Sequence, residues 1–432
     1  MEHESSGSTA TYSWYALGVL IAAYILAFVD RQVLNLLVAP IKRDLHLSDV
    51  QISLLQGLSF ALFLSFGGLP IGRLIDTRPR PRLLAACIAL WSVMTAGCGL
   101  AAGYAQFLLC RIGVGVGEAA MTPSAYSLIG DYFEDRRQGV AMALYSVGAY
   151  VGSGLALIIG AAVTARVPAG RIPAGPLGTR AGWQLVFLLV ALPGLAVGLW
   201  VATLREPARR DAASPPGLPL VLRYFRGRAR ALVAVNLAVA FAAMAIQALS
   251  AWLPSFFLRH FGLPTAETGR MLGIIIITAG AAGTVSAGLL GDRLAVARPD
   301  ARLHVLIGGA VLAAPCALVA LHAANAEAAL MWLVPTIFGL TLAIGSGPAT
   351  LQQVTPPAMR GVQHAVAVLA VNLIGLGLGP TAVALISDRL FRDEARIGEA
   401  LAITVAAALA LSIAAALMAL APYRRARAAA VA

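Results

Sequence analysis

The chain has 432 residues, of which 59% are hydrophobic and only 12% are charged, and its mean hydropathy is +0.82. Soluble domains carry about 25% charged residues, so this composition excludes a water-soluble protein and predicts an integral membrane protein. The formal net charge is +12. Because the arginines lie in short segments between apolar runs, we interpret them as topology-setting residues that face lipid, and we expect no nucleic-acid partner.

Apolar runs of about 20 residues, the length that crosses a bilayer, predict the fold. We expect an all-α membrane protein with twelve transmembrane helices, near residues 14–38, 51–75, 83–103, 105–130, 138–164, 183–204, 231–257, 270–290, 303–323, 328–350, 361–386 and 400–421. The N-terminal residues contain Glu2 and Glu4 but no basic segment, so we expect no cleaved signal peptide. The four cysteines lie in apolar runs without metal-ligand spacing, and we expect no metal site and no cofactor.

The first span is interrupted by Asp30-Arg31-Gln32. Neighbouring side chains on a helix point about 100° apart, so Asp30 and Arg31 are expected to meet partners on other helices. Asp30 would find Arg111, or would share a proton-accepting site with Glu118, and such an acid can load and release a proton. The alternative is that Asp30 and Arg31 lie at the membrane interface and cap the helix end.

The second span ends in Gly72-Arg-Leu-Ile-Asp76, and several arginines follow it. Asp76 is expected to accept from the N-terminus of a neighbouring helix or to pair with Arg136 or Arg137 in the next cytoplasmic loop. Contacts of this kind, broken and remade, would latch one side of an alternating-access cycle. The alternative is that these residues only set the topology. The predicted cytoplasmic gate comprises Gly72, Asp76, Arg80, Arg136, Arg137, Gly288 and Asp292.

The fourth span carries Arg111-Ile-Gly-Val-Gly-Val-Gly-Glu118. Arg111 and Glu118 are two helical turns apart and therefore share one face of the helix. The flanking residues 83–110 and 119–130 contain no charge. Ionisable groups in the hydrocarbon region are costly unless they pair or face a wet cavity, so they indicate function by default. The alternative is a structural ion pair that only fixes helix packing.

The longest polar stretch, residues 205–230, contains seven arginines together with Pro215, Pro216 and Pro219. We interpret it as a cytoplasmic linker between an N-terminal six-helix bundle (1–204) and a C-terminal one (231–432). Placing both termini in the cytoplasm puts twice as many basic residues inside as outside. The glycine–aspartate motif at the end of the second span recurs half a chain later as Gly288-Leu-Leu-Gly-Asp292. Two such repeats predict a substrate site at their interface.

No span of the second half carries a charge as deep in the membrane as Arg111 and Glu118. We therefore expect the titratable groups of the site to come from the N-terminal half and a more neutral surface to come from the C-terminal half. Its candidate polar residues are Gln247, Gln352, Gln353, His364 and Asn372, and we interpret the histidine as interfacial. Glycines in spans four, five and eleven are expected to let helices approach closely. We assign proton coupling to Asp30, Glu118 and Arg111. We assign substrate contacts to Arg31, Gln32, Arg111, Tyr145, Gln247 and Asn372.

These motifs resemble a known family. The glycine–aspartate loop, its half-chain echo and the Arg111-x-x-x-Gly115-x-Gly117 pattern are similar to signatures of the major facilitator superfamily. Asp30-Arg31-Gln32, the string Leu47-Ser-Asp-Val-Gln-Ile-Ser-Leu-Leu-Gln-Gly57, Gly117-Glu118-Ala with Pro123, and Asp131-Tyr-Phe133 resemble its Spinster branch. The usual loop pattern has an arginine where this chain has Thr77, which puts the strength of the cytoplasmic latch in doubt.

The resemblance implies a proton-linked secondary transporter of amphiphiles, since lysophospholipids and sphingoid phosphates are the substrates of animal members. It casts the two acids as proton-responsive groups and the two arginines as anion partners. Anion:cation symporters of the same superfamily, which move small organic anions such as sugar acids, are the nearest alternative. We expect a monomer that binds only protons, substrate and the lipid bilayer, in a bacterial inner membrane.

Two other classes of function compete with a transporter. A membrane-embedded enzyme would need a nucleophile–base or metal constellation, and the six scattered histidines offer none. A non-transporting sensor on the same fold would keep the cavity and lose the coupling. A channel is disfavoured because no ring-like repeat of charge occurs in the sequence. Substrate identity and the direction of transport do not follow from the sequence.

Overall fold

The computed structural model describes residues 2–166, 170–173, 178–209 and 217–431. Within these ranges, eleven helices are long and apolar enough to cross a membrane. The predicted fourth span is divided into two shorter helices, α6 (Tyr104–Glu118) and α7 (Met121–Tyr132), by a turn at Ala119 and Ala120. Pro123 lies in the first turn of α7 and has no N–H to donate, which favours a break at this point. Counted together, the two pieces bring the number of crossings to twelve.

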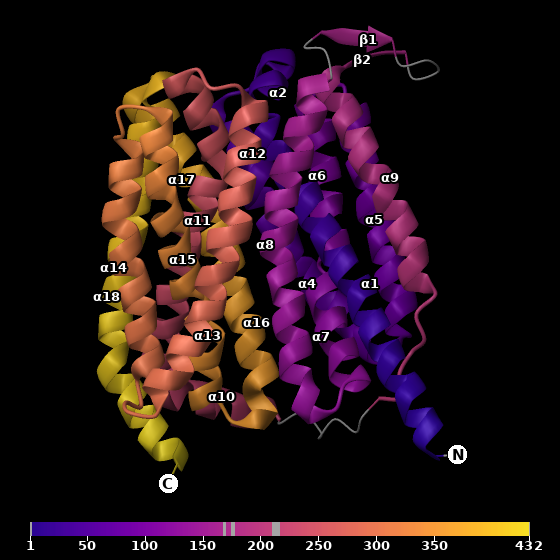
Figure 1. Ribbon diagram of the computed structural model, residues 1–432, viewed down its shortest axis with the longest axis vertical. Helices are drawn as coiled ribbons and strands as arrows, with labels where there is room; N and C mark the ends of the chain where they lie inside the picture. The colour runs from indigo at the N-terminus through magenta and orange to yellow at the C-terminus, as the bar shows by residue number, and fades with distance from the viewer. Residues whose placement is uncertain (1, 167–169, 174–177, 210–216, 432) are drawn as a thin grey trace. The chain divides into compact units, whose positions relative to one another are not determined.

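The chain divides into two compact units. The first unit comprises residues up to Asp211 together with Thr265–Gly273, and Figure 1 shows its long helices running side by side. Its elements are α1 (Glu2–Leu36), α2 (Val38–Leu45), α3 (Asp49–Ser53), the π-helical turn η1 (Leu54–Leu58), α4 (Ser59–Thr77), α5 (Arg80–Leu100), α6, α7, α8 (Asp135–Arg166), β1 (Arg171–Pro173), β2 (Thr179–Ala181) and α9 (Gly182–Ala202).

The second unit comprises Ala212–Pro264 and Ile274–Ala432, and α12 (Thr265–Ile275) leads into it from the first unit. Its elements are α10 (Leu218–Gly227), α11 (Ala229–Phe261), η3 (Ile276–Gly280), α13 (Ala281–Ala295), α14 (Ala301–Leu321), α15 (Ala326–Val354), η4 (Pro357–Met359), α16 (Arg360–Ala370), η5 (Val371–Leu378), α17 (Gly379–Leu385), η6 (Ile386–Phe391), η7 (Glu394–Arg396) and α18 (Ile397–Val431).

Glycines set how closely the helices of the first unit pack. A Cβ on Gly117 would come within 2.9 Å of the carbonyl oxygen of Cys87, so α6 lies directly against α5. A Cβ on Gly152 would come within 2.8 Å of the carbonyl oxygen of Ile25, where α8 meets α1. Only a residue without a side chain permits such close approaches. The glycines of spans four and five therefore act as small residues at helix interfaces, as the sequence predicts.

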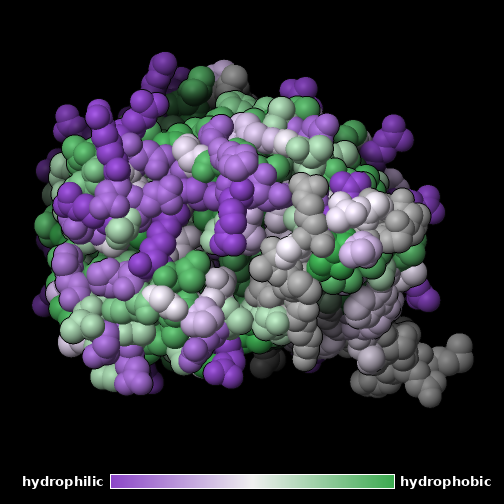
Figure 2. Space-filling view, turned by 90° about the horizontal axis from the view of Figure 1, so that it is seen from above, coloured by the Kyte–Doolittle hydropathy of each residue, from purple (hydrophilic) through white to green (hydrophobic). Residues whose placement is uncertain are grey.

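Two elements were not expected from the sequence. A short antiparallel hairpin connects α8 to α9, with Ile172 of β1 opposite Arg180 of β2. The arginine-rich segment that we interpreted as a linker contains the helix α10, whose Tyr224 packs into the core of the second unit. Figure 2 shows one end of the molecule from above, where many hydrophilic residues lie among hydrophobic ones.

The turn between α13 and α14 contains a buried carboxylate, Asp300, which precedes the first residue of α14. Arg424 of α18 donates from Nε to Asp300 Oδ2 over 2.6 Å, and the His304 ring lies 3.7 Å from the same oxygen. Burial alone would raise the pKa of Asp300, but the hydrogen bond from Arg424 and the neighbouring charges outweigh it, so the pKa lies below its ordinary value. The ion pair therefore ties α18 to the start of α14.

We expect Asp300→Asn to lower the melting temperature at neutral pH. A carboxyl with a depressed folded-state pKa stabilises the protein above its unfolded pKa, about 3.9, and that contribution disappears as the pH falls through the folded value. The difference between wild type and variant should therefore shrink below about pH 4. Asp292→Asn is the matched control, because Asp292 is paired with Arg302 but is exposed. Equal effects of the two substitutions at neutral pH would contradict this assignment.

Candidate functional site

The deepest charged groups of the first unit converge from α1 and α6. Arg31 on α1 donates from Nη2 to Glu118 Oε2 on α6, and the Glu118 side chain is 1% exposed. Asp30 and Arg31 do not lie at a helix end that they could cap, since α1 continues to Leu36, whereas Glu118 is the last residue of α6. Glu118 pairs with Arg31 and not with Arg111, which was the alternative considered for the fourth span. Because Arg31 and Glu118 lie on different helices, their ion pair links the first and fourth spans.

Asp30 lies beside this pair and is 3% exposed. Thr95 on α5 donates its hydroxyl hydrogen to Asp30 Oδ2, whereas Oδ1 has no hydrogen-bond partner among the described residues. Asp30 also interacts electrostatically with Arg111 and Glu118. The structure thus brings together the three residues that the sequence assigns to proton coupling.

Arg111 is fully buried on α6, yet it uses few of its hydrogen-bond donors. Its Nε donates to the carbonyl oxygen of Leu55 over 3.3 Å. Leu55 lies in the π-helical turn η1, and such turns release carbonyl groups from the regular helix ladder and recur at functional sites. Nη1 and Nη2 of Arg111 have no acceptor among the described residues. Buried donors in proteins are almost always satisfied, so these two nitrogens remain available for further hydrogen bonds.

Both arginines lie over one aromatic ring, that of Phe60 on α4. The guanidinium carbon of Arg31 is 4.9 Å from the ring centroid, and that of Arg111 is 5.1 Å from it. Phe60 is fully buried, and Gly115 of α6 packs against it, because a Cβ there would approach its carbonyl oxygen to 3.0 Å. The negative face of a phenyl ring attracts cations. Phe60 therefore helps two like charges share one buried site, a role that the sequence analysis missed.

An aromatic group adjoins Arg31. Tyr24 on α1 stacks on Tyr145 of α8 with ring centroids 4.3 Å apart, and Phe28 packs edge-on against Tyr24. Arg31 also lies 4.8 Å from the Phe28 centroid. The Tyr145 hydroxyl is buried and has no partner among the described residues. Tyr145, which we assigned to substrate contact, is thus adjacent to the charged group.

Gln32 takes part in a buried chain of amides. Asn35 donates to Gln32 Oε1 over 2.5 Å, and Gln56 of η1 donates to Asn35 Oδ1 over 3.0 Å. These contacts join α1 to η1, so the geometry gives Gln32 a structural link between helices in addition to its assigned role. Sequence analysis missed Asn35 and Gln56, although amides inside apolar spans are themselves a signal of such a network.

The remaining substrate candidates belong to the second unit. Gln247 lies on α11 and Asn372 lies in the π-helical turn η5, and both are half-buried. α11 packs closely on the segment that follows η5, since a Cβ on Gly379 would meet the Met244 carbonyl oxygen at 2.8 Å. In the first unit, the π-helical turn η1 supplies the carbonyl oxygen that accepts from Arg111. In the second unit, the π-helical turn η5 contains Asn372.

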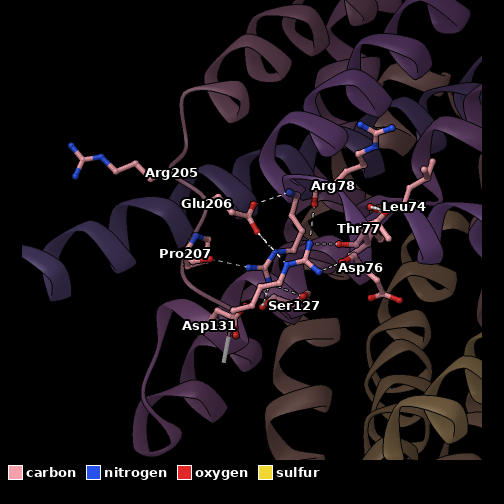
Figure 3. A network of polar contacts seen from close by, with 12 residues as sticks. Leu74, Asp76, Thr77, Arg78, Ser127, Asp131, Arg205, Glu206 and Pro207 are labelled. Atoms are coloured by element: carbon pink, nitrogen blue, oxygen red, sulfur yellow. Dashed lines mark hydrogen bonds and ion pairs between the residues drawn. The ribbon is translucent and has the colours of Figure 1, made fainter. Parts of the chain in front are cut away.

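At the predicted cytoplasmic end of the first unit, Arg80 forms a buried network (Figure 3). Its side chain donates to the Glu206 carboxylate over 2.7 Å, to the Ser127 hydroxyl over 2.8 Å and to Asp131. The Glu206 carboxylate also accepts from the backbone N–H of Arg80 over 2.7 Å. The network ties the start of α5 to α7 and to the segment after α9. The sequence analysis missed Glu206, because an acid in an arginine-rich segment that also contains Asp211 gives no distinguishing signal.

The second unit has a matching contact with exchanged charges. Arg80 and Glu206 join the third and sixth spanning helices of the first unit, and Asp300 and Arg424 join the third and sixth of the second. In each unit the pair lies where the third helix begins and the sixth ends. The half-chain repeat seen in sequence thus extends to an ion pair that no shared motif reveals.

The other gate residues are less constrained. The Asp76 side chain is exposed, points away from the Arg80 network in Figure 3 and forms no ion pair with any described side chain. Its carbonyl oxygen accepts from Arg209 instead. Arg137 is exposed, and the side chain of Arg136 lies outside the described part of the structure. Gly72 and Gly288 have open space around them, and Asp292 pairs with Arg302.

The charged side chains of this site are carboxylates and guanidinium groups. The described residues contain no group of three or more His, Cys, Asp or Glu side chains placed to hold a metal ion. What the first unit does offer is a compact set of two carboxylates and two guanidinium groups. Such a set can exchange protons and bind an anion.

The comparison with known proteins identifies the family. A profile described as the Major Facilitator Superfamily matches residues 20–380. The chain belongs to this superfamily. The twelve-helix fold and the superfamily resemblance predicted from the sequence are confirmed, and the members of this family that are similar to the chain are transporters.

Similar proteins narrow the position within the superfamily. The crystal structure of a bacterial homolog of the human lysosomal transporter Spinster, inward-facing and unoccupied, is 27% identical and covers 96% of this chain and 97% of its own, with a TM-score of 0.79. An MFS-type efflux pump of Mycolicibacterium smegmatis is 27% identical over 421 residues, 96% of this chain and 94% of its own. A probable L-galactonate transporter of Escherichia coli is 26% identical over 341 residues, 75% of this chain and 72% of its own. The chain is Spinster-like.

We expect Phe60 and Arg111 to be energetically coupled. A buried cation–π contact contributes about 0.5–2 kcal/mol. A double-mutant cycle with Phe60→Leu, Arg111→Met and the double variant, followed by unfolding of the purified protein, should give a coupling energy in that range. The same cycle with Phe257→Leu is the control, because Phe257 is equally buried, on α11, and packs against the rings of Phe256 and Phe261. A coupling of zero for Phe60, or an equal coupling for Phe257, would contradict the assigned role.

Proposed function

We propose that this protein is a proton-coupled secondary transporter that moves an amphiphilic organic anion by alternating access. The observation that carries the proposal is Arg111, which is fully buried while two of its terminal donors have no acceptor among the described residues. An unsatisfied buried donor costs about 1–3 kcal/mol. A carboxylate, phosphate or sulfate on the substrate would relieve that cost with a bidentate contact.

Charge balance supports coupling to protons. Asp30 and Glu118 together carry two negative charges when ionised, and Arg31 and Arg111 carry two positive ones, so the empty set is neutral. An anionic substrate would add uncompensated charge in a poorly solvated site, where the cost is several kcal/mol per ion. Protonation of one acid restores neutrality and frees its arginine for the substrate. Substrate and proton would therefore bind together.

Aromatic rings beside the charges support an amphiphilic substrate. Phe28, Tyr24 and Tyr145 line up next to Arg31, so an apolar body could lie against them while an anionic head meets the guanidinium groups. The similarity to Spinster, and the substrates that this resemblance implies, favour a lysophospholipid or sphingoid phosphate. The similarity to a probable L-galactonate transporter keeps a small organic anion as the second candidate.

Alternating access would use the two six-helix bundles, 1–204 and 231–432, as the moving parts around the segment 205–230. The predicted cytoplasmic gate would close one side, and Gln247 and Asn372 would supply a neutral surface from the second bundle. The basic residues favour both termini in the cytoplasm of a bacterial inner membrane, with the protein acting as a monomer.

A thermal-shift screen tests the proposal. A ligand that binds only the folded protein raises the melting temperature. We expect lysophospholipids or sphingoid phosphates to raise it more at acidic than at alkaline pH, and Arg111→Ala to weaken their binding about 10- to 100-fold, the effect of losing a charge-assisted hydrogen bond. Arg82→Ala, at an exposed arginine, is the control and should bind normally.

Other outcomes separate the competing functions. Stabilisation by a sugar acid alone would favour the small-anion symporter. Binding without uptake of substrate into proteoliposomes would favour a sensor. Normal transport with an unchanged pH dependence in both Glu118→Gln and Asp30→Asn would rule out the assigned proton-coupling residues.

A further inference from the structure

The helix α10 lies outside the spanning helices and has one face anchored to the second unit. Val221 and Tyr224 are 8% and 9% exposed, and Tyr224 packs in a cluster with Val354 of α15 and Tyr423 of α18. The Tyr224 hydroxyl donates to the carbonyl oxygen of Val354. α10 therefore has a fixed position at the ends of α15 and α18, where Figure 1 also shows it.

The exposed side of α10 combines apolar and basic residues. Leu220 and Leu222 are 53% and 46% exposed and point about 200° apart around the helix, and the exposed Arg223 and Arg226 lie on the arc between them. Single exposed leucines are ordinary on a protein surface. Two of them next to arginines, on a helix fixed at the ends of membrane-spanning helices, match the composition of helices that lie in the membrane interface.

The positive charge of this region has no acidic partner among the described residues. Residues 212–266 contain no Asp or Glu, whereas 223–230 contain four arginines. None of these four forms an ion pair with a described residue, and Asp292 and Asp300 of the same unit pair with Arg302 and Arg424. Arg228 stacks over Tyr224 at 4.6 Å, and its buried Nε has no acceptor among the described residues.

We propose that α10 is a binding site for anionic phospholipid headgroups in the leaflet at this end of the protein. The arginines meet the phosphates, and Leu220 and Leu222 enter the boundary between headgroups and acyl chains. The leucines favour a lipid over a soluble anion, because a soluble phosphate would leave them in water. The site is separate from Arg111 and its partners and does not depend on the transported substrate.

The test uses the full chain in nanodiscs of phosphatidylcholine, with or without phosphatidylglycerol. Phosphatidylglycerol should raise the melting temperature, and the rise should shrink with added salt because ions screen surface charge. Arg223→Gln with Arg226→Gln should abolish the rise, and Leu220→Ser with Leu222→Ser should reduce it. Arg223→Lys with Arg226→Lys should keep most of it, which separates lost charge from a folding defect.

The matched control is Arg293→Gln with Arg298→Gln, which removes the same charge from exposed positions of the same unit, in the last turn of α13 and in the turn that follows it. This control, and Arg111→Ala, should keep the full rise. An equal loss in the Arg293 and Arg298 variant would show a general effect of surface charge and overturn the site. An equal rise produced by soluble glycerol phosphate in phosphatidylcholine alone would overturn the role of the membrane.

Discussion

Two arginines and two carboxylates buried among membrane-spanning helices are the constraint on which the first unit depends. Each buried ion would cost several kcal/mol if left alone. The structure meets that cost by pairing Arg31 with Glu118, by holding Asp30 with Thr95 and by placing both guanidinium groups over one phenyl ring. The set is neutral as a whole, yet it leaves terminal donors of Arg111 without an acceptor among the described residues. We propose that a site of this kind is stable when empty and uses these donors to bind an anion.

The fold serves this set by close packing and by rigid ends. Gly115 lets α6 approach α4 until the arginine and the ring meet, and the π-helical turn η1 offers a carbonyl oxygen to Arg111. Further along the helices, ion pairs join the third and sixth spans of each unit, with acid and base exchanged between the units. Since both pairs lie within a unit, motion between units would leave them intact, which is what transport by rigid-body movement requires.

Much of this could be predicted from the sequence, and the reasons for the rest are physical. Twelve apolar runs predicted the fold because span length is set by the bilayer, and charges inside those runs located Asp30, Arg31, Arg111 and Glu118 because intramembrane charge is so costly. Which acid meets which arginine depends on helix rotation and could not be read from spacing. The roles of Phe60 and Glu206 were also hidden, because a phenylalanine in an apolar span and an acid in a basic loop carry no periodic signal. Asp76 is the opposite case. It belongs to a motif that is easy to recognise in the sequence, but its side chain is exposed.

The central claim is that anion binding and proton binding are coupled at one site in the first unit. The most direct test is calorimetric titration of the purified protein with a lysophospholipid or sphingoid phosphate near neutral pH, in buffers that differ in ionisation enthalpy. The account predicts that binding takes up protons from the buffer, and that the uptake is lost when Glu118→Gln and Asp30→Asn are combined. Binding of the anion with no proton uptake at any pH would contradict the account.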